Sequence, residues 1–318
     1  MKVKGSAALS EAVAFDFNLR QRVNRNNKMG ITRQNLINAA MLALERSLKK
    51  LPDDIYEALV SAAERESHPQ SRKTIEVILE NIRMASQKGF PLCQDTGIPG
   101  FLLEVGLRSG INFDLQEALT IASRQVTRDF PLIAHAVHPV TRENPGTNVG
   151  LATPVVHVSV VPESDEVAIT AKPFSAIEAK CAMRAFDVTA SRKEMERFLL
   201  ETVSEAGIVC PPLLVGIGLG SSMGNIGLLA LKATLRPVGS SNPDKQIAAL
   251  EEGWLEMINR IGMGAMNLGG DVTATALHIE GGFTHSVHTL MAIRCECWCN
   301  RRATVRVGQD GSIRFGEG

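Results

Sequence analysis

The spacing of apolar residues changes character near residue 90, and this change constrains the fold more than any other feature of the sequence. In the segments 31–50, 53–64 and 71–88, apolar residues recur every three or four positions, as they do in amphipathic helices. Gly89 then stands where a glycine commonly ends a helix. The sequence therefore predicts a mainly helical region over residues 1–90.

Beyond this region, segments with strand character alternate with helical ones. Strands are predicted at 101–107, 153–161 and 167–171, and helices at 115–127, 178–186, 193–205 and 248–261. From Val272 onward the pattern returns to strands, with a hairpin signal around Asp310-Gly311. We expect an α/β mixed (α+β) fold, in which the helical N-terminal region packs on a mixed-sheet domain and residues 1–318 form a single domain.

Charge and composition argue against several classes of protein. Lys plus Arg equals Asp plus Glu at 34 each, which is not the basic balance of a nucleic-acid binder. No apolar run approaches the ~20 residues of a membrane span. The first residues meet Glu11 and Asp16 too early for a secretory signal. We therefore expect a cytoplasmic protein whose six cysteines are either inert thiols or metal ligands.

Most of the cysteines lie in three distinctive segments. These are PLCQDTG (91–97), Cys210-Pro211-Pro212 running on into a glycine-rich stretch, and CECWCNRR (295–302). Cys93 and Cys210 stand beside loop-forming residues, which suits a backbone wrapped around a compact cofactor. Cys181 lies in a stretch with helical character, so we expect it to be an inert, packed thiol.

Three thiolates from distant segments have a specific use in iron–sulfur chemistry. A cubane cluster held by three cysteines leaves one iron open, where a substrate hydroxyl can bind to a Lewis acid. No CxxC pair is present, so spacing alone does not establish a metal site. Cys295, Cys297 and Cys299 would share one face of a strand. We expect one ligand flanked by two bystanders there, and a zinc site built from all three stays an alternative.

The glycine-rich stretch 216–222 matches a dinucleotide-binding loop only loosely. We expect it instead to lead into a helix N-terminus near the metal site, where backbone N–H groups favour an anion.

Several longer motifs, taken together, are specific. They are PLCQDTG (91–97), TRENPGTN (141–148), the Cys210-Pro211-Pro212 segment, LLALKATLRPVGSSNPD (228–244), GMGAMNLGGDVTATALHIE (262–280) and CWCNRRAT (297–304). With these motifs the chain resembles the α subunit, equally the N-terminal domain, of the iron–sulfur hydro-lyases, namely class I fumarases and L-tartrate dehydratases. The likeness extends from the N-terminal helices to about Val307.

The resemblance implies that Cys93, Cys210 and Cys297 hold a [4Fe–4S] cluster. Cys297 is preferred over its neighbours because the third ligand of the family opens a Cys-Trp-x-x-Arg-Arg pattern. The resemblance also implies that Gln94 and Asp95 line the substrate pocket, with Asp95 a catalytic candidate.

Two histidines compete for one further role. His285 stands twelve residues before Cys297, which resembles the family's spacing for a substrate-binding histidine, so it is a candidate for both catalysis and substrate binding. His288 is the competing candidate.

Two departures from the family pattern concern the substrate. Ile133 stands where the family has an arginine that grips a substrate carboxylate, and residues 172–177 lack the family's Lys-Gly-Gly-Gly glycines. We expect His135, or an arginine elsewhere, to take part in substrate binding instead. The cluster is therefore better supported than the identity of the acid.

The resemblance implies reversible dehydration of a small hydroxy-(di)carboxylic acid, of the fumarate/malate or tartrate type. In the family a second, smaller domain or β subunit supplies the base, and only a short hairpin follows Thr304 here. We therefore expect a β partner in a hetero-oligomer, of α2β2 form, and no nucleic-acid or membrane partner. The alternatives are a cluster-bearing redox or sensing subunit and a metal-free structural subunit.

Overall fold

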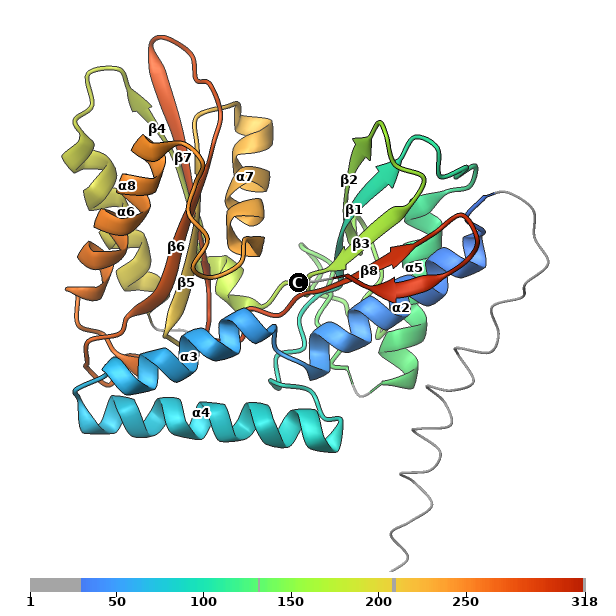
Figure 1. The fold of residues 1–318 in the computed structure, drawn as a ribbon, viewed down its shortest axis with the longest axis horizontal. Coiled ribbons are helices and arrows are strands. Elements are labelled where there is room, and N and C mark those ends of the chain that lie inside the picture. Colours follow the sequence, from blue (N-terminus) through green and yellow to red (C-terminus); the bar gives the residue numbers. More distant parts are fainter. Residues whose placement is uncertain (1–29, 131, 208–209, 317–318) are drawn as a thin grey trace, which may run out of the picture. The chain divides into compact units, whose positions relative to one another are not determined.

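The computed structural model describes residues 30–316 except 131, 208 and 209, so the expectation about an export signal lies outside the described residues. Within this part the chain divides into two compact units (Figure 1). The five-stranded unit contains residues 30–47, 96–173 and 302–316, and the four-stranded unit contains residues 48–95 and 174–301. The predicted mixed α+β class is confirmed, and the assignment of one domain stays a prediction.

The five-stranded unit has the strand order β2-β1-β3-β8-β9 among the described residues. Its strands are β1 (Gly100–Gly106), β2 (Val155–Val161), β3 (Val167–Ala171), β8 (Ala303–Val307) and β9 (Ile313–Phe315), and its helices are α2 (Arg33–Lys49) and α5 (Leu115–Asp129). Only β1 and β2 are parallel among these described pairs, and β8 and β9 form the predicted hairpin.

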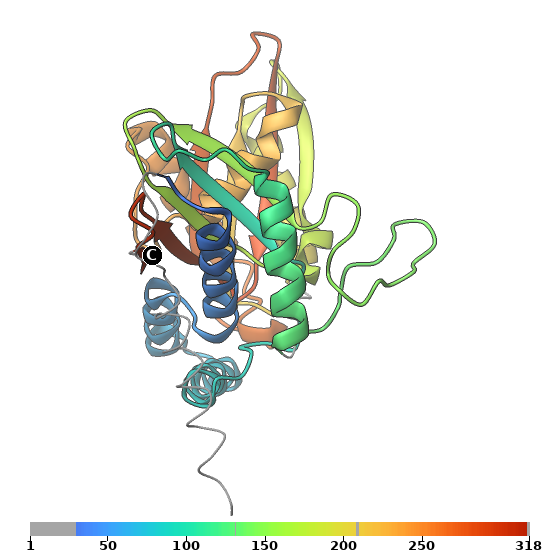
Figure 2. The ribbon, with the colours of Figure 1, turned by 90° about the vertical axis from the view of Figure 1, so that its right-hand side faces the viewer.

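Helices α2 and α5 lie side by side on one face of this sheet (Figure 2). Leu36, Ala40 and Leu44 of α2 follow the helical spacing seen in the sequence, and each is at most 1% exposed. An ion pair of 2.6 Å between Arg33 and Glu117 joins the two helices. Burial of the apolar stripe therefore determines how α2 packs.

The four-stranded unit has the strand order β4-β7-β5-β6 among the described residues. Its strands are β4 (Ala182–Asp187), β5 (Leu213–Leu219), β6 (Ala274–Gly281) and β7 (His288–Glu296). Its helices are α3 (Asp53–Arg65), α4 (Pro69–Lys88), α6 (Arg192–Ala206), α7 (Met223–Leu235) and α8 (Lys245–Asn259), with short 3-10 turns η1 (Ala176–Lys180) and η2 (Ala265–Asn267).

Helices cover both faces of this second sheet (Figure 1). Ile293 of β7 packs in one apolar core with Phe198 of α6 and Trp254 of α8. Ala292, the preceding residue of the same strand, packs in a second core with Ile226 of α7. Since neighbouring strand residues point to opposite faces, β7 lies between the two helical layers.

The glycine-rich stretch serves the packing of α7. A Cβ on Gly216 would lie 2.4 Å from the carbonyl oxygen of Ala230, and one on Gly218 would lie 2.3 Å from that of Ile226. Only glycine allows the helix backbone so close to β5. Cys210 precedes β5, whereas α7 begins beyond its far end, so the expected helix N-terminus near Cys210 is wrong.

The predicted helix over 178–186 is also wrong, because η1 and then the strand β4 occupy this stretch. β4 pairs antiparallel with β7 along its whole length, from Ala182 opposite Ile293 to Asp187 opposite His288. This ladder outweighs a weak local helical preference. Cys181 consequently lies between a 3-10 turn and a strand, not inside a helix.

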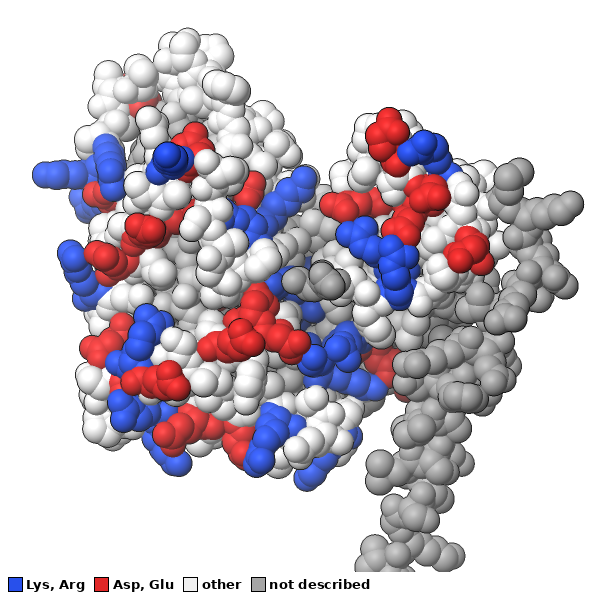
Figure 3. All heavy atoms as spheres, viewed as in Figure 1, with Lys and Arg blue, Asp and Glu red and all other residues white. Residues whose placement is uncertain are grey.

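Charges of both signs are interspersed over the face of the molecule drawn in Figure 3. This distribution matches the zero formal charge of the sequence. None of the helices among the described residues is long and apolar enough to cross a membrane.

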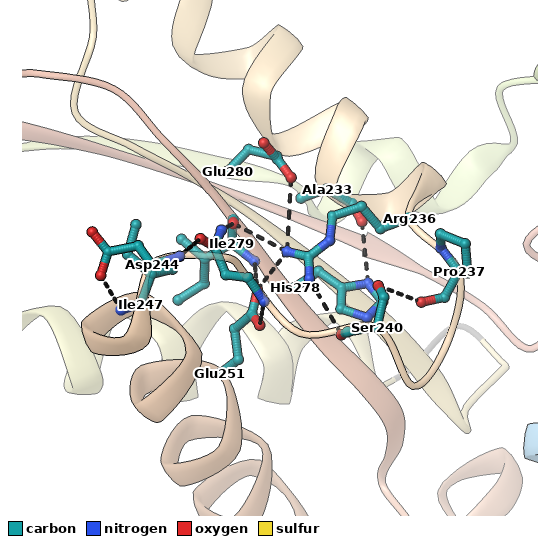
Figure 4. Close-up of polar contacts among 11 residues, drawn as sticks. Ala233, Arg236, Pro237, Ser240, Asp244, Ile247, Glu251, His278, Ile279 and Glu280 are labelled. Atoms are coloured by element: carbon teal, nitrogen blue, oxygen red, sulfur yellow. Dashed lines mark hydrogen bonds and ion pairs between the residues drawn. The ribbon is translucent and has the colours of Figure 1, made fainter.

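A buried ion pair anchors the segment that follows α7 (Figure 4). Arg236 and Glu251 approach to 2.6 Å, with side chains 15% and 6% exposed. The same carboxylate accepts hydrogen bonds from the backbone N–H groups of Ile279 at 2.8 Å and Asn242 at 3.0 Å. One buried glutamate therefore ties α8 to β6 and to the loop at Asn242.

We predict that Glu251→Ala lowers the free energy of unfolding by about 3 kcal/mol, because it leaves the Arg236 cation with only the more distant Glu280 at 3.7 Å and removes the acceptor of two backbone N–H groups. Glu256→Ala on the same helix is the control, since its partner Arg260 is 3.4 Å away and both side chains are more than 70% exposed. That control should change stability by less than about 1 kcal/mol. Urea unfolding of both variants measures the difference, and equal losses would contradict the role given to Glu251.

Candidate metal centre

Three predicted ligands converge on one apolar surface. Cys93, Cys210 and Cys297 all pack against a group of buried residues that we call the α3–α4 cluster. Its members are Leu51, Ile55, Leu59, Ile78, Ile82, Ala85, Leu92, Trp298 and Cys299. The thiols of Cys93 and Cys210 are close enough to interact electrostatically. Segments more than eighty residues apart in the sequence are thus brought together within the four-stranded unit.

The loop that carries Cys93 is fixed where α4 ends. Gly89 adopts a left-handed conformation (φ 69°) and stops the helix, as predicted. The N–H of Leu92 donates to the carbonyl of Leu48 at 2.9 Å, and the Leu92 carbonyl accepts from the Asn81 side chain at 3.0 Å. The residue before Cys93 is therefore bonded through both backbone polar groups.

The other two cysteine segments are joined to each other. Cys210 precedes β5 with a positive φ of 52°, a conformation that costs energy for a side chain with a Cβ. Its carbonyl accepts a hydrogen bond of 3.2 Å from the N–H of Trp298, which follows Cys297. Cys297 itself begins the turn at the end of β7. A strained residue held by a neighbouring turn is a common feature of functional sites.

Burial favours the neutral thiol form of two candidate ligands, Cys210 and Cys297. It raises the pKa of the Cys210 thiol, with a smaller contribution from Cys93 and Asp95. Burial likewise raises the pKa of Cys297, which also has Cys299 as a neighbour. A bound metal replaces these protons, since thiolates are the ligand form.

The three thiols are soft donors of the type that an iron–sulfur cluster takes. Among the described residues no group of three or more His, Cys, Asp or Glu side chains converges on one point where a single ion would sit. The thiolates of a cubane cluster bind different irons, so they stand farther apart than the ligands of one ion. Soft thiolate donors also favour iron–sulfur clusters over hard cations.

The zinc alternative for the third segment is not supported. Cys295 is fully buried in the core between the sheet and helices α6 and α8. Cys299 belongs to the α3–α4 cluster instead. These two cysteines therefore do not share one strand face, because β7 ends at Glu296.

Arg301 adds a buried positive charge beside the thiols. It is 3% exposed, and its Nη2 donates to the carbonyl of Asp95 at 2.5 Å. Within the described part of the chain, Nη1 is buried and has no hydrogen-bond partner. A cation with an unsatisfied donor fits a site that receives an anionic group. The sequence motif contained this residue, but a buried position for it was not predicted.

Asp95 is oriented by the segment that departs from the family pattern. Its Oδ2 accepts a hydrogen bond from the N–H of Ala176 at 2.8 Å. Phe174, in the same segment, is 8% exposed and lies under the guanidinium of Arg294, 5.2 Å from its ring centre. Gln94, between Cys93 and Asp95, is exposed. The structure thus places Gln94 and Asp95 beside Cys93, as chain order requires.

The structure does not bring His285 to these cysteines within the unit. His285 and His288 stack with ring centres 5.3 Å apart in the loop before β7, whereas Cys297 follows the other end of that strand. At ~3.3 Å per residue, nine residues separate the two ends by roughly 30 Å. His135 lies in the five-stranded unit, where its N–H donates to Asn148 Oδ1 at 2.7 Å. The functional roles of both histidines stay predictions.

Comparison with known proteins defines the class to which this fold and site belong. The model of the fumarate hydratase (Fumerase) family matches residues 37–306, and the chain belongs to this family of hydro-lyases. It is 38% identical over 268 residues to a putative L(+)-tartrate dehydratase subunit alpha from Methanocaldococcus jannaschii, covering 83% of this chain and 94% of that protein. It is 30% identical over 266 residues to the L(+)-tartrate dehydratase subunit alpha of Escherichia coli K12, covering 82% and 87%.

We predict that Cys181 behaves as an inert thiol at neutral pH. Burial raises its pKa to about 11, and the opposing effect of Arg294 is smaller. The thiolate fraction therefore stays small below that pH and rises tenfold per pH unit towards it. Iodoacetamide labelling of the metal-free chain, followed by peptide mass spectrometry, should show this slope for Cys181 between pH 8 and 10. A labelling rate that is high and flat over this range would contradict it.

Proposed function

We propose that this chain is the alpha-type subunit of a [4Fe–4S]-dependent hydro-lyase that reversibly dehydrates a small hydroxy-(di)carboxylic acid of the fumarate/malate or tartrate type. The observation that carries the proposal is the convergence of Cys93, Cys210 and Cys297 on the α3–α4 cluster in a chain of this family. The names of the two relatives support the substrate class.

In this proposal Cys93, Cys210 and Cys297 hold the cluster as thiolates. The bound cluster supplies a Lewis-acidic iron with an open position for the substrate hydroxyl. The apolar side chains of Leu92 and Trp298 exclude water from the protein side of the site. Exclusion of water strengthens every charge interaction there.

The neighbouring polar residues orient the substrate. The hydrogen bond from Ala176 N–H to Asp95 Oδ2 fixes the plane of that carboxylate, which we assign to the movement of a substrate proton. We assign to the amide of Gln94, which is exposed, the donation of a hydrogen bond to a substrate carboxylate. His285 and His135 are the further proposed contacts for the acid, in place of the arginine that Ile133 replaces.

A second subunit completes the enzyme in our proposal. Both relatives are named as alpha subunits, which supports a smaller β partner that supplies the remaining catalytic and carboxylate-binding groups in an α2β2 assembly. We place the complex in the cytoplasm, where thiols stay reduced and a cluster can be assembled.

One observation favours the alternative of a redox or sensing subunit. Cys299 is a fourth thiol in the α3–α4 cluster and interacts electrostatically with Cys297. Four cysteine ligands would close the cluster and leave no iron for a substrate. The two functions therefore differ in whether Cys299 binds iron.

We predict that the anaerobically purified chain, co-expressed with its β partner, holds four irons and four sulfides. The EPR spectrum of the reduced cluster should change when fumarate, L-malate or L(+)-tartrate is added. Cys93→Ser, Cys210→Ser and Cys297→Ser should each lose most of the iron, whereas Cys181→Ser, the matched control, should keep it. Absence of iron from the wild type, or a cluster indifferent to these three substitutions, would sink the proposal.

Cys299→Ser separates the two functions in the same preparation. Under the hydro-lyase proposal this variant keeps its iron and its spectral response to the acid. Loss of iron from Cys299→Ser, with no response to any acid in the wild type, would establish the redox alternative.

A further inference from the structure

Arg301 closes the turn that follows the third candidate ligand and reaches the loop of the first. Its backbone N–H donates to the carbonyl of Cys299 at 2.8 Å. Its Nη2 donates to the carbonyl of Asp95 at 2.5 Å, two residues after Cys93. One side chain thus bridges two of the three cysteine segments.

The guanidinium has thiols as its electrostatic neighbours. Burial lowers the pKa of Arg301, but Cys299, Cys297 and Cys93, followed by Asp95, raise it by more, so the net pKa lies above the usual value. An arginine side chain stays charged in proteins, and this one is only 3% exposed. Its Nη1 is buried and, among the described residues, has no hydrogen-bond partner.

Two other buried arginines of the same unit are neutralised in the ordinary way. Arg236 pairs with Glu251 at 2.6 Å and donates to backbone carbonyls as well (Figure 4). Arg294 pairs with Glu296 at 2.8 Å. Arg301 instead has the sulfur atoms of Cys299, Cys297 and Cys93 as its main electrostatic neighbours, with a smaller contribution from the Asp95 carboxylate. A buried guanidinium with an unsatisfied N–H group is unfavourable unless an accepting, anionic group arrives at the site.

We propose that Arg301 is the counter-charge of the anionic group held by Cys93 and Cys297, with Nη1 donating to a sulfur of that group while Nη2 keeps the Cys93 loop in place. The inference rests on the proposed iron–sulfur cluster. Hydrogen bonds and positive charge at the sulfurs stabilise the reduced, more negative state of a cluster, so they raise its reduction potential. Arg301 is in this sense a positioning and tuning residue that acts through the cofactor.

The test compares Arg301→Gln and Arg301→Lys with wild type and with Arg236→Lys, all as full chains co-expressed with the partner and reconstituted anaerobically. Iron and sulfide content, circular dichroism and an EPR-monitored reductive titration are measured for each. Arg301→Gln should make reduction at least tenfold less favourable, which is a shift of about 59 mV or more to negative potential for one electron. Arg301→Lys should recover part of this shift because it keeps the charge. Arg236→Lys should leave the potential unchanged.

The outcomes separate this inference from the proposed function. No iron in the wild type removes the proposed function itself. A wild-type cluster with a potential that neither Arg301 variant alters would overturn the inference and leave the proposed function standing. If Arg301→Gln fails to fold, Arg301→Lys decides, because a structural role alone would not move the potential of a folded, iron-loaded variant. A folded Arg301→Gln chain that cannot retain iron, beside an Arg301→Lys chain that can, supports the counter-charge role.

Discussion

The packing of Leu92 and Trp298 against helices α3 and α4 is the constraint on which the candidate site depends. These two side chains flank Cys93 and Cys297 in the sequence, so burying them also places the thiols on the same apolar surface. The backbone bond from Trp298 to the Cys210 carbonyl then adds the third thiol. Burial of these apolar side chains brings the three cysteines together, and a few backbone hydrogen bonds fix the loops that carry them.

Three buried charged side chains of the four-stranded unit differ in the partners that surround them. Arg236 is paired with a carboxylate on α8. Glu66 is fully buried, and backbone N–H groups of His68, Asp271 and Val272 satisfy it at 2.9 to 3.1 Å. These hydrogen bonds lower its pKa in spite of burial, which acts in the opposite direction. Both arrangements are complete without any ligand. Arg301 is different because its buried Nη1 has no hydrogen-bond partner among the described residues.

Much of the fold follows from local patterns in the sequence, and the exceptions have physical causes. The helices α2, α3 and α4 show their apolar stripes directly, and Gly89 marks the end of α4. β5 was not predicted because its residues are buried on both faces, so it lacks the alternation of a half-buried strand. The sequence predicts a helix where β4 lies, because the strand character of β4 comes from its pairing with β7. This pairing joins residues about 110 positions apart, so no local pattern in the sequence indicates it.

For the candidate site, too, local sequence patterns predict some features, whereas features that depend on distant contacts are not predicted. The loop setting of Cys93 and Cys210 was readable from neighbouring glycine and proline residues. Their convergence with Cys297 came from the family resemblance, since periodicity carries no information about contacts across two hundred residues. The burial of Arg301 was not predicted, because an arginine beside a cysteine motif is usually a solvated charge. Its burial follows from the turn after β7.

The departure over residues 172–177 has a structural consequence for the choice of substrate. A glycine segment would let its backbone approach a bound group closely, whereas here the segment carries Phe174, which is buried beneath Arg294. The N–H of Ala176, which a glycine-rich loop could offer to a ligand, is instead engaged by Asp95. The backbone of this segment therefore orients the carboxylate of Asp95. In our proposal, recognition of the acid's carboxylates then falls to groups outside this segment. Because Ile133 cannot form a charged pair, we propose that a β partner supplies more of this recognition.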